Sequence, residues 1–587
     1  MGNNMGLWNY YFIAKLFLFA GRYIDFHVLP NLALAAFLVI PVQHPRLGML
    51  RQIVAVPAGI VLFYHDTWLP PIARLFSQAT VLQGFSVTYM MEILGRFISP
   101  VAIIGLVILF VAFYYTNRKF RKTTPFVFAA MLVPLMPIFS TSVPVKLSNV
   151  TFPADAALTL SNSAEPALAV SVTPSESEKL AMAKSEVSRV ADEPVEKTQT
   201  TGKAVATVAP GMEPAAPVVI NVSGLAAEAA LTASLSAFYR QEGLRKVAFV
   251  SKPADAPFDI IFVQICSLSW DDLDIKKERN NALFKRFNIV FTNFNSAATY
   301  SGPAAIRLLR GSCGQQQHVN LYTPFSPQCL IFNNLRQIGF DTQLAMNHDG
   351  RFGGLLNDIR ERGGMHAALF DTKDSAPYLK SFDGSPIHND FAVLSEWWKK
   401  RLQAPTARVA LFYNGVSLHD GNRYADGRVG NSLETYHSRL TRLLGDVDRF
   451  ISEIQASGRR AIVVFIPEHG AALRGDKMQI AGMREIPSPR ISIVPVGIKL
   501  IGLPENPEMK PLVVSKHTSY VAISQLLAEF IRATPFGGST QDIEKFVREL
   551  PTTEFVAEND DVVVMRRGKQ YFIRSKDVAW TAFDPSE

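Results

Sequence analysis

Three segments of the chain place a thiol, a carboxylate, an imidazole and a hydroxyl where loops follow apolar runs. The run IFVQI ends at Cys266, and the run AIVVFIP ends at Glu468 and His469. The third segment, FNSAATYSGPAAIRLL, contains Ser301. A thiolate, a carboxylate and an imidazole at adjacent strand ends suit a zinc ion. These residue types therefore predict a metal centre beside a hydroxyl nucleophile.

The hydroxyl group stands at the expected start of a helix. Ser301, Gly302 and Pro303 precede an apolar helical stretch, residues 304–309. Serine is a favoured N-cap and proline fits the first turn, so we expect Ser301 to cap this helix. The free N–H groups and the positive end of a helix favour a phosphate group and an alkoxide. A metal ion would activate the hydroxyl and polarise a phosphoryl oxygen.

Each of these signals also has a simple structural interpretation. A single Cys266 fits a hydrophobic core, a single Ser301 fits a helix cap, and the pair at 468–469 fits an exposed loop. His419 and Arg484 are weak candidates by spacing alone. Only the combination indicates a catalytic site.

Alternating short β-branched runs and helical stretches follow from about residue 258, which predicts a parallel sheet with helices on both faces. In such sheets the chemistry lies in loops after the carboxyl ends of strands. The predicted strands are residues 260–265, 342–346, 367–370, 409–413, 461–466 and 496–500. The predicted helices are residues 304–309, 352–362, 391–401, 433–457 and 519–532, with an earlier one at 225–244. A terminal hairpin is expected at 562–565 and 571–574 around Gly568.

The first part of the chain is apolar enough for a membrane. Five segments are candidate spans, with an interfacial helix as the alternative for the first. Positive residues in the loop NRKFRKTT, and Arg46 with Arg51 in an earlier loop, predict cytoplasmic loops and hence a periplasmic C-terminal domain. No cleavable signal peptide is expected. The candidate spans are residues 7–26, 28–42, 53–69, 97–116 and 126–139.

Composition divides the chain into three parts. Residues 145–222 are rich in Ala, Val, Thr, Ser, Pro and Glu, which predicts a flexible linker. The predicted domains are thus a transmembrane domain at 1–144, the linker, and a catalytic α/β domain at 223–587. The formal net charge is +8, but basic residues are scattered without an aromatic-basic stripe, so no nucleic-acid partner is expected.

Long blocks of sequence closely resemble the BcsG family of cellulose phosphoethanolamine transferases. The resemblance spans nearly the whole C-terminal domain and also includes FYHDTWLP in the membrane part, whereas the linker differs. That family belongs to the alkaline-phosphatase and sulfatase superfamily, so the resemblance implies a doubly wound, alkaline-phosphatase-like sheet. The matching blocks are ICSLSW, FNSAATYSGPAAIRLLRGSCGQ, RFGG, FDGSP, LHDGN and IPEHGAALRGDKMQIAGMREIPSP.

The resemblance also implies a reaction. It implies transfer of phosphoethanolamine from phosphatidylethanolamine to glucose 6-hydroxyls of cellulose, at the bacterial inner membrane and beside cellulose synthase subunits. Ser301 is the implied nucleophile. One zinc ion is implied, with the ligands Cys266, Ser301, Glu468 and His469. Tyr300, His419 and Arg484 match positions linked to activity, with Arg484 expected to neutralise phosphate and His419 to act first as acid and then as base.

Three cysteines are an odd number, so at least one stands outside any internal disulfide. With Cys266 assigned to zinc by the resemblance, Cys313 and Cys329 are predicted to pair in an oxidising periplasm. Other readings stay open. They are a transferase of phosphoethanolamine or phosphoglycerol acting on lipid A or another glycan, a hydrolase, and a non-catalytic subunit of the synthase complex.

Overall fold

A computed structural model describes residues 5–67 apart from 21–23, 25 and 43, residues 89–92, single residues between 104 and 131, and residues 225–585 with short gaps. The gaps are 251–256, 374, 477, 480, 504–509, 534–535, 537–539 and 576–577. The predicted linker and most of the fourth and fifth apolar segments lie outside these residues. The boundaries of the three predicted domains therefore remain a prediction.

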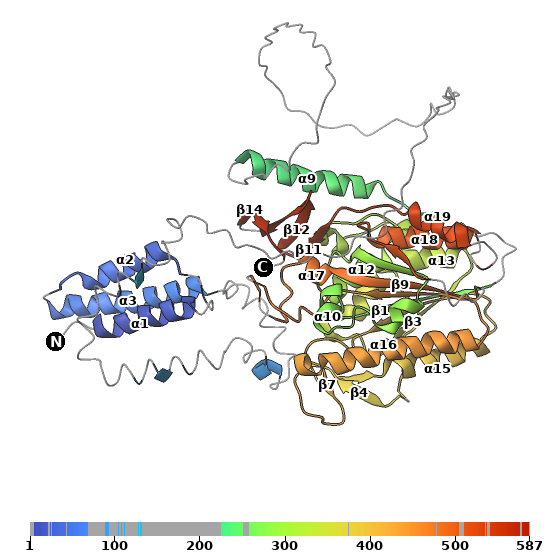
Figure 1. Ribbon diagram of the computed structural model, residues 1–587, viewed down its shortest axis with the longest axis horizontal. Coiled ribbons are helices and arrows are strands. Elements are labelled where there is room, and N and C mark those ends of the chain that lie inside the picture. Colours follow the sequence, from blue (N-terminus) through green and yellow to red (C-terminus); the bar gives the residue numbers. More distant parts are fainter. Residues whose placement is uncertain are drawn as a thin grey trace, which may run out of the picture. The chain divides into compact units, whose positions relative to one another are not determined.

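Three N-terminal helices pack through apolar side chains, among them Trp8, Phe12 and Leu38. They are α1 (Met5–Ala20), α2 (Val28–Val39) and α3 (Pro45–Asp66) (Figure 1). Within the described residues, only α3 contains a helix long and apolar enough to cross a membrane, Arg46–Asp66 with a mean hydropathy of 1.6.

The third helix begins earlier than the sequence suggested. It starts at Pro45 rather than at residue 53, so Arg46 and Arg51 lie in its first two turns and not in a loop. The buried guanidinium of Arg51 donates to the carbonyl of Ile40, 2.6 Å away. This bond provides a donor for a free carbonyl at the end of α2. It also gives the buried charge of Arg51 a partner within an otherwise apolar helix.

The C-terminal domain is built on a seven-stranded sheet in the order β10-β2-β9-β8-β1-β6-β3. The strands β8, β1, β6 and β3 run parallel, as expected, but β9 runs antiparallel to both of its neighbours. The sheet is therefore mixed. The strand bounds are β1 Asp259–Ile265, β2 Ile289–Asn295, β3 Asp341–Met346, β6 Val409–Gly415, β8 Ala461–Pro467, β9 Ile493–Ile501 and β10 Leu512–Val514.

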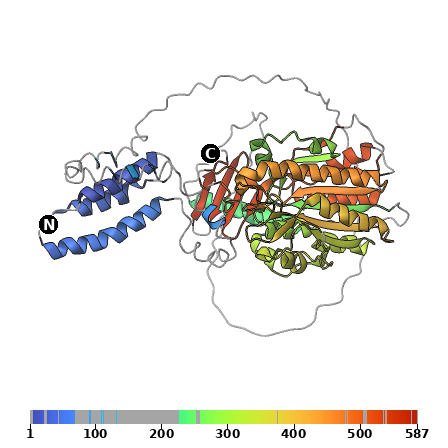
Figure 2. The same ribbon diagram turned by 90° about the horizontal axis from the view of Figure 1, so that it is seen from below.

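Helices cover both faces of this sheet, which confirms the doubly wound arrangement. Strand β1 shows why, because Ile260 and Phe262 enter one apolar core while Ile261 and Val263 enter the other. Figure 1 shows α15 and α16 on one side and α12, α13, α18 and α19 on the other, and Figure 2 shows the molecule from below, the side of α15 and α16. The first face carries α10 (Trp270–Ile275), α11 (Ala282–Arg286), α15 (Asp390–Gln403) and α16 (Ser432–Ala456). The second carries α12 (Ser301–Leu309), α13 (Ile331–Gln337), α14 (Leu355–Asn357), α18 (Tyr520–Ala533) and α19 (Thr540–Arg548).

Two predicted elements are wrong. Residues 367–370 form only an isolated bridge, between Leu369 and Leu344. Residues 352–362 are not one helix, because Gly353 and Gly354 have positive φ and break the segment into a 3₁₀ turn, α14 and a π-helical turn at Asp358–Arg362.

Smaller sheets complete the domain. The expected terminal hairpin is the centre of a four-stranded antiparallel sheet, β11 (Val556–Glu558), β12 (Val562–Arg567), β13 (Gln570–Ser575) and β14 (Val578–Phe583). The predicted helix at 225–244 is α9 (Leu225–Gly243), and it packs Leu231 and Leu235 against this sheet. A second small sheet contains β4 (Pro377–Lys380), β5 (Pro386–His388) and β7 (Arg423–Tyr424), and α17 (Pro489–Ser492) precedes β9.

Candidate active site

The candidate site lies at the carboxyl edge of the sheet, where β8, β1 and β6 end side by side. In the register, Ile265 of β1 pairs with Pro467 of β8 and with Gly415 of β6. The next residues, Cys266 and Glu468, therefore emerge together. Backbone bonds hold the loops after the strands, since the Leu268 N–H donates to the His469 carbonyl over 2.6 Å.

Cys266, Glu468 and His469 form a compact cluster of ligand-type atoms. One ligand atom from each lies within 4.8 Å of the others, and all three residues are fully buried. The Cys266 Sγ lies 4.0 Å from His469 Nε2, and this nitrogen lies 3.8 Å from Glu468 Oε2. The turn after β8 thus directs two consecutive side chains to one point, which a straight strand would not do.

Burial disfavours the charged forms of all three residues in the cluster. Burial, then the charge of Glu468, raises the pKa of the Cys266 thiol to about 12. Burial likewise raises the pKa of Glu468. It lowers the pKa of His469, together with the charge of Arg484, so the imidazole is neutral. A cation at this point would reverse the first two effects and accept the neutral imidazole as a ligand.

One carboxylate oxygen of Glu468 is held and the other is free for a cation. Asn414, at the end of β6, donates its Nδ2–H to Oε1 over 2.6 Å. Oε2 is buried and has no hydrogen-bond partner among the described residues. An unpartnered buried carboxylate oxygen next to a thiol and an imidazole fits a zinc ion. Sequence reasoning missed Asn414, although an amide in the otherwise apolar run VALFYNG was a signal.

Ser301 faces this cluster from the first turn of α12. Its Oγ lies 3.4 Å from the Cys266 Sγ. The N-cap of α12 is Tyr300 rather than Ser301, contrary to the sequence prediction, and Tyr300 makes no side-chain cap bond. The Ser301 hydroxyl is thus directed toward the ligand cluster instead of toward the helix backbone.

The loop after β1 is held in an uncommon backbone conformation. Ser267 has a φ of +73°, a region that a non-glycine residue adopts at a cost. The Tyr436 hydroxyl donates to the Ser267 carbonyl over 2.6 Å and fixes this turn. The Ser267 Oγ then lies 3.1 Å from the Cys266 Sγ.

Arg484 and Tyr300 border the cluster. The Arg484 Nη1 donates to Ser267 Oγ over 3.1 Å and lies 3.4 Å from His469 Nδ1. Its guanidinium lies 5.7 Å from the centre of the Tyr300 ring, whose hydroxyl donates to Glu485. These contacts hold the positively charged guanidinium at the border of the cluster.

His419 lies four residues after the end of β6 at Gly415, near the edge of the sheet that carries the cluster, and it contributes to the lowered pKa of His469. Its Nδ1 lies 2.7 Å from the Asp420 carbonyl, which only accepts, so Nδ1 carries the proton and Nε2 presents a lone pair. Burial, then the charge of Arg484, lowers the pKa of His419 to about 4. The resting imidazole is consequently neutral at pH 7, with its Nε2 lone pair unprotonated.

A short segment from the N-terminal part contacts the loop beside His419. Tyr89 donates its hydroxyl to Asp420 Oδ2 over 3.0 Å, and Glu92 pairs with Arg423 over 2.6 Å. Glu92 also accepts from Ser432, the first residue of α16. Sequence reasoning missed these contacts, because no local pattern links residues so distant in the chain.

Cys313 and Cys329 form a disulfide, as predicted, with their Cα atoms 4.9 Å apart. The bridge closes the loop that follows α12. Cys266 is the free cysteine. The structure therefore keeps the remaining thiol available for the ligand cluster.

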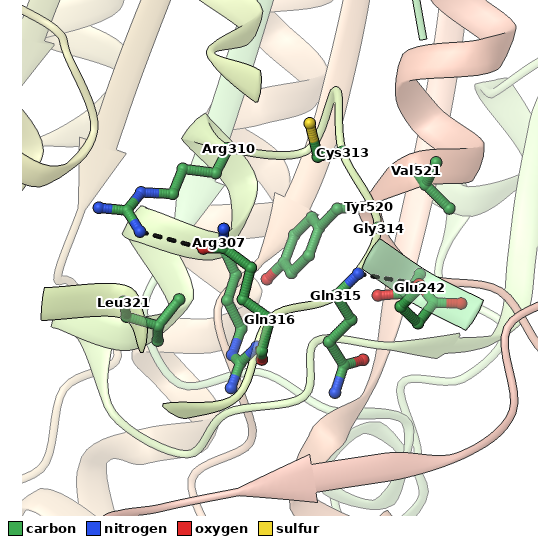
Figure 3. A pocket seen from close by; sticks show the side chains of 11 residues that line it. Glu242, Arg307, Arg310, Cys313, Gly314, Gln315, Gln316, Leu321, Tyr520 and Val521 are labelled. Carbon is green, nitrogen blue, oxygen red and sulfur yellow. Dashed lines mark hydrogen bonds between the residues drawn. The ribbon is translucent and has the colours of Figure 1, made fainter. Parts of the chain in front are cut away.

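A small cavity lies at the opposite end of α12 (Figure 3). Its volume is about 20 Å³, enough for one water molecule. Arg307, Gln315 and Tyr520 contribute buried polar atoms without hydrogen-bond partners among the described residues. Two donors and an acceptor fit a bridging water. None of the residues that line this cavity belongs to the ligand cluster.

The fold and the cluster together define an α/β protein with an enzyme-type site at the carboxyl edge of its sheet. Family models for the C-terminal and N-terminal domains of cellulose biosynthesis protein BcsG match residues 220–580 and 8–166. The chain belongs to the BcsG family.

Curated relatives cover almost the whole chain. The cellulose biosynthesis protein BcsG of Escherichia coli is 38% identical over 578 residues, 98% of this chain and 96% of the relative. The protein of the same name from Salmonella typhimurium is 36% identical over 581 residues, with the same coverage.

Several solved structures are similar in fold. An alkaline phosphatase superfamily protein from Vibrio parahaemolyticus covers 60% of this chain and 87% of its own, with 12% identity and a TM-score of 0.43. The integral membrane lipooligosaccharide phosphoethanolamine transferase A of Neisseria meningitidis covers 53% and 61%, with 10% identity and a TM-score of 0.35.

Proposed function

We propose that the chain is a zinc-dependent transferase that moves phosphoethanolamine from phosphatidylethanolamine to glucose 6-hydroxyls of cellulose. The observation that carries this proposal is the position of Ser301. Its hydroxyl stands at a helix N-terminus, 3.4 Å from Cys266 and beside the buried cluster with Glu468 and His469. A nucleophile, metal ligands and helix N–H groups at one point suit phosphoryl transfer.

Membership of the BcsG family supports cellulose as the acceptor. Both curated relatives are cellulose biosynthesis proteins that match over 98% of this chain. Cellulose and the subunits that synthesise it are accordingly the proposed partners. Phosphatidylethanolamine is the proposed donor because it is a bilayer lipid that carries the transferred group.

The proposed location is the inner membrane, with several N-terminal spans and a periplasmic catalytic domain. The apolar helix α3 and the basic loop NRKFRKTT support this topology. The disulfide supports an oxidising compartment. A catalytic domain tethered there reaches both a lipid headgroup and an emerging polymer.

Four residues would hold the zinc ion: Cys266, Ser301, Glu468 and His469. When bound, zinc supplies a positive charge that stabilises the serine alkoxide and polarises a phosphoryl oxygen. Asn414 orients Glu468 from the far side.

In the first step, Ser301 Oγ loses its proton and bonds to phosphorus. The bond from phosphorus to the glycerol oxygen breaks, and His419 returns to that oxygen the proton that Ser301 has lost, so that diacylglycerol leaves. Arg484 neutralises a phosphate oxygen, because a guanidinium matches that geometry.

In the second step, the glucose 6-oxygen bonds to phosphorus, the bond to Ser301 breaks and Ser301 regains a proton. The Nε2 lone pair of His419 takes the sugar proton. Neutral His419 can take a proton, and the protonated form can then give one to a leaving oxygen, so both of its expected roles belong to this proposal.

Intact mass of the full chain, reconstituted with phosphatidylethanolamine and no acceptor, tests the nucleophile and the donor. The wild type gains the mass of one phosphoethanolamine group. Ser301→Ala gains nothing, because the bond to phosphorus cannot form. The matched control, Ser326→Ala, changes an exposed serine in the loop after α12 and labels like the wild type.

Three outcomes contradict the proposal in different ways. Labelled Ser301→Ala means that another residue is the nucleophile. A phosphoglycerol adduct on the wild type changes the donor. Labelling that persists in a chelator, in protein shown to be metal-free, rejects zinc. Adding soluble cello-oligosaccharide discharges the adduct onto the sugar if cellulose is the acceptor, and release to water alone indicates a hydrolase.

A further inference from the structure

A second group of metal-ligand side chains lies at the ends of the N-terminal helices. His27 is the N-cap of α2, and His65 and Asp66 are the last two residues of α3. One ligand atom from each lies within 4.8 Å of the others. We call these three residues the helix-end cluster. The proposed transfer reaction does not use them.

Two neighbours fix the buried carboxylate of this cluster. Lys15 Nζ lies 2.5 Å from Asp66 Oδ2, and Asn31 donates its Nδ2–H to the same oxygen over 2.8 Å. Lys15 also donates to Asn31 Oδ1. The carboxylate is therefore oriented by one oxygen, while its Oδ1 is directed at the histidines.

The histidines meet that second oxygen at distances suited to a shared ion. His27 Nδ1 lies 2.8 Å from Asp66 Oδ1, and His65 Nδ1 lies 3.6 Å from it. Tetrahedral zinc with bonds of 2.0–2.1 Å holds its ligand atoms roughly 3.3 Å apart. The observed separations lie on either side of this value, so a small shift of two side chains admits the ion.

Exposure leaves room for a fourth ligand. The side chains of His27 and His65 are 47% and 60% exposed, whereas Asp66 is fully buried. The ion would thus have protein on one side and solvent on the other, where water completes the tetrahedron. Two imidazoles and a carboxylate are ligands that zinc and similar divalent ions accept, and Lys15 and Asn31 form the outer contacts that orient the carboxylate.

We infer that His27, His65 and Asp66 bind a second divalent transition-metal ion, which joins the ends of α2 and α3. Binding displaces the proton that His27 shares with Asp66. The positive charge of Lys15 and the absence of a thiolate make this site weaker than the cluster at Cys266. A mild chelator consequently removes the helix-end ion first.

The test counts zinc in the full chain in detergent, by elemental analysis after dialysis against zinc. His65→Ala loses one ion relative to the wild type. The matched control, His44→Ala, changes an exposed histidine at the N-cap of α3 that makes no side-chain cap bond, and keeps the wild-type count. Equal counts in His65→Ala and the wild type overturn the inference.

Cobalt separates this inference from the proposed active-site zinc. Cobalt bound to Cys266 gives a thiolate charge-transfer band, whereas cobalt at the helix-end cluster gives only ligand-field bands. His27→Ala and His65→Ala each lose ligand-field intensity and keep the thiolate band. Cys266→Ser loses the thiolate band and keeps the ligand-field bands of the helix-end cluster. A thiolate band without any change in His65→Ala rejects the second site alone, and an absent thiolate band counts against the proposed active-site metal alone.

Discussion

Glu468 and Asp66 are both fully buried carboxylates beside histidines, but their neighbours differ. Asp66 has a buried lysine 2.5 Å away. Glu468 has a buried thiol, a neutral imidazole and one oxygen without a partner. Asp66 therefore has a cation of the chain in direct contact, whereas no cation bonds to Glu468 and Arg484 only borders its cluster.

Glu468→Gln should have the largest effect. The amide keeps the bond from Asn414 but loses the ligand charge, so we expect transfer activity to fall about 10³-fold, comparable to removal of a key electrostatic group. The metal-free variant should be more stable than metal-free wild type, by about 1–3 kcal/mol, because a buried charge is gone. Activity assays and denaturant unfolding in chelator measure both effects. The control Glu361→Gln, at an exposed acid, should change neither, and lower stability of metal-free Glu468→Gln would contradict the comparison.

Asp66→Asn should lower the stability of the protein, the opposite of the gain expected for metal-free Glu468→Gln. It leaves Lys15 buried without its partner, which should destabilise the N-terminal helices by about 3–5 kcal/mol. Unfolding of the full chain in detergent measures this loss. The double variant with Lys15→Met removes both charges and should recover most of the stability. A double variant as unstable as the single one would show that the charge pair is not the cause.

Asp272 tests a third buried carboxylate, whose Oδ2 accepts several hydrogen bonds while its Oδ1 has no partner among the described residues. It accepts from the backbone N–H of Ser269 and of Ala471, each at 2.8 Å. Burial still raises its pKa to about 6. The folded state then holds the proton more tightly than the unfolded state, so this stability is full below about pH 4 and is lost as pH rises through 6.

The size of this pH effect follows from the shift of about two pKa units, roughly 3 kcal/mol. Asp272→Asn should remove it, and the difference between variant and wild type isolates it from other groups that titrate there. Denaturant unfolding from pH 4 to 7 provides the measurement. Parallel pH curves for the two proteins would mean that Asp272 titrates normally.

Asn414→Ala should have the smallest effect of the four. It removes the donor that orients Glu468 and leaves all four ligands in place. Loss of such an outer contact typically lowers metal affinity 10–100-fold. Competition with a calibrated chelator gives the affinity, and an unchanged value would mean that the β6 end does not position the ligand.

The sequence was sufficient to predict that Cys266, Ser301, Glu468 and His469 converge. Apolar runs marked β1 and β8, and carboxyl ends of parallel strands meet at one edge. Strand β2 was missed, because Asn293 and Asn295 interrupt its apolar run. The direction of β9 was missed too, since a fully buried strand has the same composition in either direction.

Interactions between distant segments were beyond sequence reasoning. The bond from Asn414 to Glu468 joins two strands that are separated by β1, and the contact of Tyr89 with Asp420 joins residues far apart in the chain. Neither has a local pattern. The start of α12 at Ser301 was misjudged for a similar reason, because the serine hydroxyl faces a thiol from another strand instead of its own helix.

The disulfide has a consequence for how the thiols of the newly made chain are oxidised. A chain with three thiols can form three different pairs, and only the pair of Cys313 with Cys329 leaves Cys266 free. Cys266 precedes both partners, so in a chain exported from its N-terminus it meets the oxidising compartment first. Any early bridge to Cys266 yields a chain without its sulfur ligand until thiol exchange corrects it. Under the proposed periplasmic location, the order in which the three thiols oxidise would therefore decide how much protein keeps Cys266 available as a ligand.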